Sequence, residues 1–409
     1  MSTEVWGPPL GAARVRLLTG RRGRPIALAM LFGYFLALVA AGGHDHWDVF
    51  YVADLRPAFV DLRSVTSAWE CTRDGVEVLA ANPCDPGGRP ANYPRLWLLP
   101  SWTGAGEETT MALGIATAVV FFGSFFALVG PVGALEGLVY GVALTSPVVM
   151  LGVERGNADL IVFAVVVAAI ALFRARRGLL RGCAHALLLL AAMLKLFPAF
   201  AFALLARQPP RWRLIGGGAV LALFAAYALV TLDDIRTIRK VVPQEIWFSY
   251  GAGVGVEAVL GHPSRLVTWI VVATALCAAA LVAWRRAYVA GGPATDNRAL
   301  DAFVAGGAMY VGTFALAHHY DYRLIILLLT LPQLFRWARE GSAPLPLPRV
   351  TLGAVLGSLW LSEVFTFEAV DVPLEEVLNW FLFVSFSAAL LTLAARAVLR
   401  ERGQPIAAS

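Results

Sequence analysis

The chain carries little charge for its length. Of its 409 residues, 15% are Asp, Glu, Lys or Arg, whereas a soluble domain carries about 25%. Apolar residues make up 58% of the sequence, and the mean hydropathy is +0.69. No polar stretch is longer than the one at 44–109, so a separate soluble domain is not expected. This composition indicates a multi-span membrane protein.

Cysteine is also scarce, with 4 in the whole chain. Two of them, Cys71 and Cys84, lie in the first large loop. If that loop lies outside the cytosol, a disulfide between them is expected; the alternative is two reduced thiols. Cys183 and Cys277 fall in apolar runs and are expected to pack there.

Nucleotide-binding motifs are missing as well. The sequence contains no P-loop and no dinucleotide-binding fingerprint, so no nucleotide site is expected. The net charge of +5 does not indicate nucleic-acid binding, because the arginines sit in short loops where they orient helices.

Long apolar runs recur from one end of the chain to the other. Most of them are about 17–22 residues long, which is the length of a membrane-spanning helix. They lie at 26–43, 110–131, 134–152, 157–173, 182–206, 212–230, 267–284, 300–317, 323–337, 349–365 and 377–395.

Arginines in the short connections predict the orientation of these runs. Those at 14–24, 174–177 and 285–286 are expected to be cytosolic. A single crossing at 182–206 would leave Arg207 outside. Dividing that run at Lys195 into a hairpin of two half-helices restores the rule. Broken helices are tolerated at membrane depth where protein buries them or where they line a cavity.

The expected fold is an all-α polytopic membrane protein of about 10–12 transmembrane helices, forming one integral membrane domain over 1–409. Both termini are expected to be cytosolic, in a bacterial plasma membrane. The divisions are a cytosolic N-terminal tail, an ordered first extracytoplasmic loop, the hairpin or broken helix, a second extracytoplasmic loop and a cytosolic C-terminal tail, at 1–25, 44–109, 182–206, 231–266 and 396–409.

A polar cluster opens the run at 157–173. Glu154, Arg155, Asn157 and Asp159 stand close together where the helix is expected to begin on the outer side. Unpaired N–H groups at a helix N-terminus attract a phosphate, and Arg155 would add a charge-assisted hydrogen bond. The alternative is a plain helix cap at Asn157 with an interfacial ion pair between Glu154 and Arg155.

Two further cations are expected on the same outer side. Lys195 stands at the tip of the hairpin, where it either binds a phosphate or extends to the interface. Arg323 follows Tyr320 and Asp321 at another outer helix start. Arg323 would reach a phosphate, while Tyr320 and Asp321 would contact substrate; the alternative is an Asp–Arg pair beside interfacial tyrosines.

A carboxylate follows the first span. Asp48 could accept a proton from a hydroxyl that attacks an activated sugar, with Asp45 and Tyr51 beside it as substrate contacts. The alternative is a helix cap. Asp45, Asp54 and Asp61 compete with Asp48 for the role of base.

The first loop is turn-rich between Asn82 and Pro94, which suggests a stiff lid over the site. Asn92 and Tyr93 are candidates to face the substrate from it. No cofactor is expected. A divalent metal on the His–Asp groups at 44–48 or 318–321 is conceivable, although neither spacing is a recognised zinc pattern.

A resemblance to glycosyltransferase family 87 rests on 154–160 (Glu-Arg-Gly-Asn-Ala-Asp-Leu) and 194–198 (Leu-Lys-Leu-Phe-Pro). The run at 48–53 also resembles that family's Asp-x-x-x-Tyr-x-Ala stretch. The resemblance implies a GT-C-like bundle and an inverting transfer of a hexose, mostly mannose, from a polyprenyl-phosphate carrier. It also implies Asp48 as general base on the extracytoplasmic face.

The expected partners are thus a polyprenyl-phosphate-sugar donor, a lipid or glycan acceptor and membrane lipids, without nucleic acid. Two other functions stay open. A lipid-linked glycan polymerase or ligase would carry a larger late outer loop rich in arginine. A lipid-linked glycan transporter would carry polar residues through the membrane or inverted repeats.

Overall fold

The computed structural model describes residues 21–242, 249–285, 298–316, 318–340, 347–364 and 371–401. This part of the chain is almost entirely helical and contains six helices long and apolar enough to cross a membrane, or seven if one bent pair counts as a span. The prediction of an all-α polytopic membrane protein is confirmed. The expected tails and the second outer loop fall partly outside the described residues.

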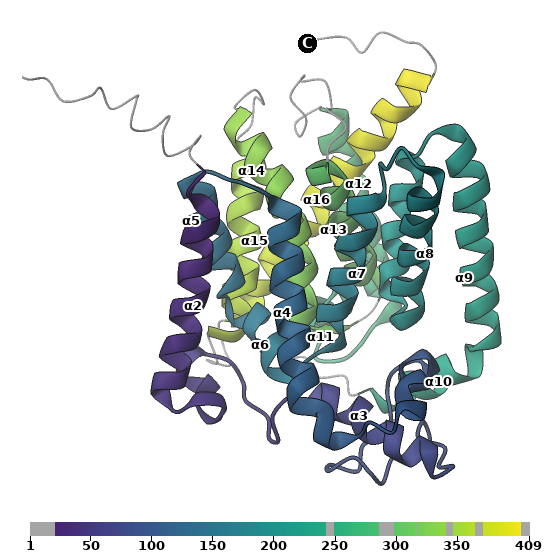
Figure 1. Cartoon of the computed structure of the whole chain (residues 1–409). Coiled ribbons are helices and arrows are strands. Elements are labelled where there is room, and N and C mark those ends of the chain that lie inside the picture. The colour runs from purple at the N-terminus through teal and green to yellow at the C-terminus, as the bar shows by residue number, and fades with distance from the viewer. Residues whose placement is uncertain are drawn as a thin grey trace, which may run out of the picture.

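The helices in the first part of the chain run from the first span to the predicted hairpin (Figure 1). They are α2 (Gly23–Ala41), η1 (Gly43–Phe50), α3 (Val60–Arg73), η2 (Arg95–Thr103), η3 (Glu107–Thr109), α4 (Thr110–Val129), α5 (Ala134–Leu144), α6 (Pro147–Arg155), α7 (Ala158–Leu172), α8 (Gly178–Leu194) and η4 (Phe197–Arg207).

The remaining elements include a short antiparallel pairing in which Tyr250 stands opposite His319. They are η5 (Trp212–Gly217), α9 (Gly218–Val230), α10 (Leu232–Val241), β1 (Ser249–Tyr250), α11 (Ala252–Leu260), α12 (Arg265–Trp284), α13 (Arg298–Leu316), β2 (His319–Tyr320), η6 (Asp321–Leu329), α14 (Leu331–Glu340), α15 (Leu347–Val364) and α16 (Asp371–Glu401).

The bundle has a buried centre and a lipid-facing periphery. In α13, 78% of the span is buried inside the protein, whereas only 17% is buried in α2 and in α12. Because exposed leucines and valines on the outer helices would face hydrocarbon, they need no protein cover. The described chain begins and ends at the upper end of the bundle in Figure 1, and α3 and α10 lie at the lower end.

The run at 182–206 is divided in the structure. α8 ends at Leu194 and η4 begins at Phe197, with Pro198 in its first turn, where proline is tolerated because its missing N–H would be unpaired anyway. Lys195 between the two helices contacts Asp159 at the start of α7. The expectation that Arg207 lies on the cytosolic side predicted this break.

Ion pairs fix the directions of these helices. Arg174, just past the end of α7, and Arg207, at the end of η4, both bond the buried carboxylate of Asp301. Lys195 contacts the beginning of α7, whereas Arg207 shares a carboxylate with Arg174 just past the end of α7. The chain therefore turns back at Lys195, and α8 and η4 form a hairpin. Its tip lies at the end of the bundle that carries α3.

We use the term lid for residues 60–109, which contain α3, η2 and η3. Cys71 and Cys84 form a disulfide with a Cα–Cα distance of 5.8 Å. Behind it, a small core that includes Val78 and Leu79 packs against Ile238 of α10. The lid is therefore an ordered unit, held at one end of the bundle.

The disulfide should contribute to the stability of the lid. Replacing both Cys71 and Cys84 with alanine removes a cross-link with a sequence separation of 13, and the expected loss is about 3 kcal/mol against local unfolding. Amide hydrogen exchange across α3 measures this loss. The control is the pair Cys183→Ala and Cys277→Ala, because both thiols are free. Equal exchange in the two double variants would show that the cross-link does not hold the lid.

Candidate functional site

The junction between α6 and α7 places the first polar group. Gly156 ends α6 with φ 58°, in the left-handed region that glycine adopts without a steric penalty. Asn157 then caps α7, because its Oδ1 accepts a hydrogen bond of 2.9 Å from the backbone N–H of Asp159. The cap at Asn157, which the sequence offered as the alternative to a phosphate site, is therefore present. The turn directs the Asp159 side chain into the protein, where it is 1% exposed.

Asp159 is the centre of a buried ionic group. Lys195 Nζ lies 2.5 Å from Asp159 Oδ1, and Arg323 Nε lies 3.2 Å from Asp159 Oδ2. The two cationic side chains are only 11% and 15% exposed. Buried charges of this kind are kept only when they are paired. We call Asp159, Lys195 and Arg323 the ionic cluster.

Lys195 is held on several sides. Its ammonium donates to Asn157 Oδ1 at 3.2 Å and lies 5.1 Å from the ring centre of Tyr93 and 5.8 Å from that of Tyr322. These ring faces favour a cation. Because three residues besides Asp159 surround the ammonium, its position is fixed before any substrate binds.

Arg323 is fixed in a similar way. Its guanidinium lies 4.6 Å from the ring centre of Phe197 and hydrogen-bonds His319 through Nη1. The pKa of His319 lies well below its usual value, because burial and the nearby positive charges of Arg323 and Lys195 disfavour the imidazolium. His319 is thus neutral, so its Nδ1 accepts the bond from Arg323.

One link between the lid and the ionic cluster runs through Asp61 and Asn157. Asp61 of α3 accepts a hydrogen bond of 2.6 Å from Asn157 Nδ2, so Asn157 joins the lid, the cap of α7 and Lys195. Asp61 was only a competitor for the base in the sequence. Its place here was not predictable, because it pairs across a sequence separation of 96.

A second ionic group lies at the end of α6. Arg155 Nε lies 3.2 Å from Glu154 Oε2, and Glu154 Oε1 accepts a bond of 3.0 Å from the Leu55 N–H. His44 Nε2 is 3.9 Å from the same carboxylate. The sequence predicted that Arg155, Lys195 and Arg323 bind the same phosphate. Lys195 and Arg323 share Asp159, whereas Arg155 takes Glu154 as its partner.

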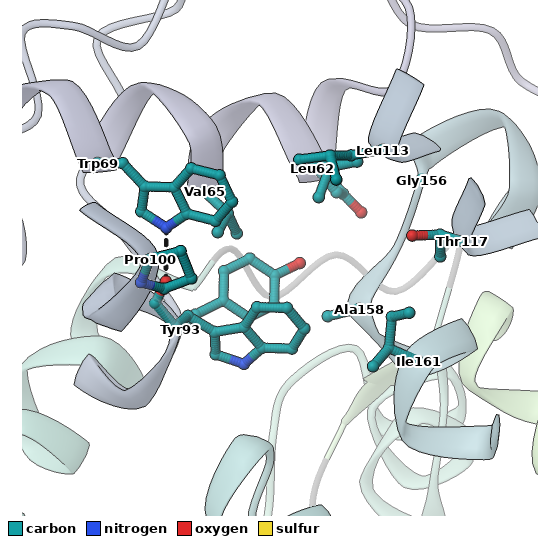
Figure 2. A pocket seen from close by; sticks show the side chains of 12 residues that line it. Leu62, Val65, Trp69, Tyr93, Pro100, Leu113, Thr117, Gly156, Ala158 and Ile161 are labelled. Atoms are coloured by element: carbon teal, nitrogen blue, oxygen red, sulfur yellow. Dashed lines mark hydrogen bonds between the residues drawn. The ribbon is translucent and has the colours of Figure 1, made fainter. Parts of the chain in front are cut away.

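Asp61 is one of the residues that line a cavity of about 230 Å³, and Figure 2 gives a close view of this cavity. Its walls come from the lid and from helices α4 and α7. The lining residues are Asp61, Leu62, Val65, Trp69, Tyr93, Trp97, Pro100, Leu113, Thr117, Gly156, Ala158 and Ile161. Tyr93, a predicted substrate contact, belongs to this wall and also touches Lys195. The ring of Tyr93 thus joins the cavity to the ionic cluster.

Other predicted residues lie apart from the cavity wall. Asp48 is exposed on η1, and Tyr51 is 58% exposed with φ 59°. Asp45 is also exposed and lies 3.6 Å from Arg56. Asn92 is half-buried in the lid and is not among the lining residues.

Asp321 begins η6 two residues before Arg323, and Tyr320 lies just before it at the end of β2. The Tyr320 ring stacks on that of Tyr322 with a centroid distance of 5.6 Å, and Asp321 is fully buried. Asp159, rather than Asp321, is the carboxylate that pairs with Arg323. Instead of the local Asp–Arg pair that the sequence offered as an alternative, Arg323 pairs with a carboxylate of a distant segment, because α7 and η6 pack together.

Sequence analysis did not identify the aromatic wall of the cavity. Trp69 and Trp97 come from different helices of the lid, and the Trp69 indole N–H donates to the Trp97 carbonyl at 2.6 Å. No local motif signals such a pair. His319 was considered only as a metal ligand, and its partner Arg323 lies one turn further along. Within the described ranges, no three His, Cys, Asp or Glu side chains are arranged to hold a metal ion.

No protein-family model matches the chain, and no curated protein matches its sequence. Among solved structures, it is similar to ArnT from Cupriavidus metallidurans in the apo state, with a TM-score of 0.37 and 15% sequence identity. The match covers 88% of this chain and 77% of that chain. At this TM-score the likeness adds no argument to the geometry of the site.

The ionic cluster should show strong energetic coupling. Asp159→Asn leaves two buried cations with a reduced partner and is expected to cost about 3–5 kcal/mol of unfolding free energy. Adding Lys195→Met should cost far less than its effect alone, with a coupling of about 1–3 kcal/mol. Unfolding of the two single variants and the double variant in micelles measures it.

The matched control is the exposed pair Asp233 and Arg236 on α10, whose atoms lie 3.0 Å apart. Water screens this pair, so no measurable coupling is expected. Additive effects of Asp159→Asn and Lys195→Met would contradict a coupled cluster.

Proposed function

We propose that this protein is a GT-C-type membrane glycosyltransferase, similar to family 87. It would move a hexose, mannose by resemblance, from a polyprenyl-phosphate carrier to a lipid or glycan acceptor. The observation that carries the proposal is the fixed ionic cluster beside a cavity at one end of the helical bundle. Paired, pre-positioned cations at a membrane surface suit a lipid phosphate.

The phosphate would bind to Lys195 and Arg323. Arg323 uses Nε and Nη1 for Asp159 and His319, and within the described residues its Nη2 has no hydrogen-bond acceptor. Lys195 forms an ion pair with Asp159 and donates to Asn157, which leaves at least one of its three N–H groups. Both remaining donors carry charge, and such donors make the stronger bonds to phosphate oxygens. Arg155 could join only by leaving Glu154.

The general base would be Asp61, with Asp48 as the alternative. Asp61 lines the cavity, and Asn157 fixes its Oδ2. The resemblance favours Asp48, which is exposed on η1. A base must come within hydrogen-bond reach of the hydroxyl it deprotonates. Asp61 meets this requirement for any acceptor that enters the cavity.

In the proposed reaction, the carboxylate removes the proton of the acceptor hydroxyl while that oxygen attacks the anomeric carbon of the sugar. The bond from this carbon to the phosphate oxygen breaks, and the lipid phosphate leaves with the extra negative charge. Lys195 and Arg323 would stabilise that charge, and the attack from the opposite face inverts the anomeric centre. Asn157, Asp159 and Glu154 would position these groups.

The proposed site faces the extracytoplasmic side of a plasma membrane, with both termini cytosolic. Two features support this orientation. The disulfide lies in the lid at the same end as the cluster, and disulfides persist outside the cytosol. Arg174 and Arg207 lie at the opposite end, as the excess of arginine on cytoplasmic loops requires.

Transfer from radiolabelled polyprenyl-phosphate-mannose to a pool of membrane lipids tests the proposal, with the protein in lipid nanodiscs. Asp61→Asn should lower the rate by about 10²–10⁴-fold, because a general base contributes that much. Asp48→Asn should leave most of the rate, and the control Asp233→Asn, at an exposed residue of α10, all of it.

The outcomes separate the alternatives. A large loss with Asp48→Asn alone would move the base to Asp48 and keep the reaction. Extension of a labelled glycan by whole repeat units would indicate a polymerase or ligase. Movement of the intact lipid-linked sugar across the bilayer without cleavage would indicate a transporter.

A further inference from the structure

We propose that the cavity beside Asp61 receives the acceptor, and that the acceptor is an alcohol whose hydroxyl is carried by a mainly apolar body, such as an isoprenoid or other lipid alcohol. This inference rests on the proposed function and specifies its acceptor. A free saccharide is the substrate class that it excludes.

The aromatic wall offers ring faces rather than hydrogen bonds. The Trp69 indole N–H donates to the Trp97 carbonyl at 2.6 Å, shown as a dashed line in Figure 2. The Trp97 N–H donates to the Leu194 carbonyl at 3.0 Å. Each indole therefore donates its single N–H to a backbone carbonyl, and neither can donate a hydrogen bond to a sugar hydroxyl.

The rest of the wall is similarly poor in polar groups. Leu62, Val65, Leu113 and Ile161 surround the space with aliphatic side chains. Its polar side chains are the carboxylate of Asp61 and the hydroxyls of Tyr93 and Thr117; in Figure 2 the Thr117 hydroxyl points toward the space. A hexose buried here would leave several hydroxyls without partners, and each would cost about 1–3 kcal/mol.

The size and position of the cavity point the same way. Pockets that enclose a drug-sized ligand measure about 300–1,000 Å³, so a cavity of about 230 Å³ encloses only part of a substrate. The cavity has few polar groups because part of its wall comes from the apolar helices α4 and α7, which supply Leu113 and Ile161. An amphiphile in the bilayer could place its apolar body between these helices and its hydroxyl at Asp61.

The position of Asp61 assigns the cavity to the acceptor. In the proposed reaction the base must meet the acceptor hydroxyl, whereas the cations must meet the donor phosphate. Asp61 lines the cavity, but Lys195 and Arg323 are not among its lining residues. Asn157 lies between the two, hydrogen-bonded to both Asp61 and Lys195. The donor and acceptor sites are therefore adjacent and separate.

The test offers three acceptors with the same labelled donor: citronellol as a short isoprenoid alcohol, methyl mannoside as a saccharide, and the crude membrane-lipid pool. Wild-type protein should label citronellol and the pool, but not methyl mannoside. Val65→Phe fills the cavity and should raise the KM for citronellol about tenfold or more, with donor binding unchanged.

The control is Leu99→Phe, because Leu99 is 61% exposed on the same lid and is not a lining residue. Ile161→Phe provides a second filling variant from α7 if Val65→Phe misfolds, which gel filtration and donor binding would reveal. Both filling variants should change KM more than kcat.

Each result decides the matter. Label on methyl mannoside but not on citronellol would overturn the inference and keep the glycosyltransferase. So would a KM for citronellol that both filling variants leave unchanged. Transfer to none of the three acceptors, with the donor bound and intact, would contradict the proposed function itself.

Discussion

The buried carboxylate of Asp159 is the constraint on which the rest of this end of the bundle depends. It sits in the first turn of α7 and pairs with Lys195 from the hairpin and Arg323 from η6. Leaving either cation unpaired inside the protein would be costly, so the three segments must stay together. The hairpin tip, which would otherwise be an unstable break in a membrane helix, is fixed at the site by this requirement.

A second buried carboxylate with two cationic partners holds the opposite end of the bundle. Asp301 at the start of α13 is fully buried and bonds Arg174 and Arg207. Asp159 and Asp301, each paired with two cations, thus hold the segment from α7 through η4 at opposite ends of the bundle. Because α13 is also the most buried of the candidate spans, its position is set by packing as well as by charge. The result is a rigid frame, against which the lid presents Asp61.

Local chemistry made part of this structure predictable. The rule that arginines stay cytosolic predicted the break beside Lys195, since it depends only on the residues next to each span. The Asn157 cap was predictable for the same reason, because a cap bonds an N–H only two residues away. The apolar runs likewise predicted the helical membrane fold from their length alone.

The pairing of distant side chains was not predictable. The sequence offered the pair of neighbours Glu154 and Arg155 as an alternative, and the structure contains it. Nothing in the sequence indicates that Arg323 reaches Asp159 across a sequence separation of 164. The aromatic wall is similar, since Trp69 and Trp97 meet only after α3 and η2 have packed. Asp61 could be listed among the carboxylates near the first span, yet only packing of the lid gives it Asn157 as a partner and the cavity as a neighbour.

Equilibrium binding of polyprenyl phosphate to the protein in nanodiscs tests the central claim most directly. Lys195→Met and Arg323→Gln should each weaken binding by about 10–100-fold, because a hydrogen bond from a charged group is worth about 1.5–3 kcal/mol. Arg95→Gln is the control, since Arg95 is a half-exposed arginine of the lid that pairs with Glu77 and Asp234. Unchanged affinity in both cluster variants, with the fold intact, would contradict the assignment of this cluster as the phosphate site.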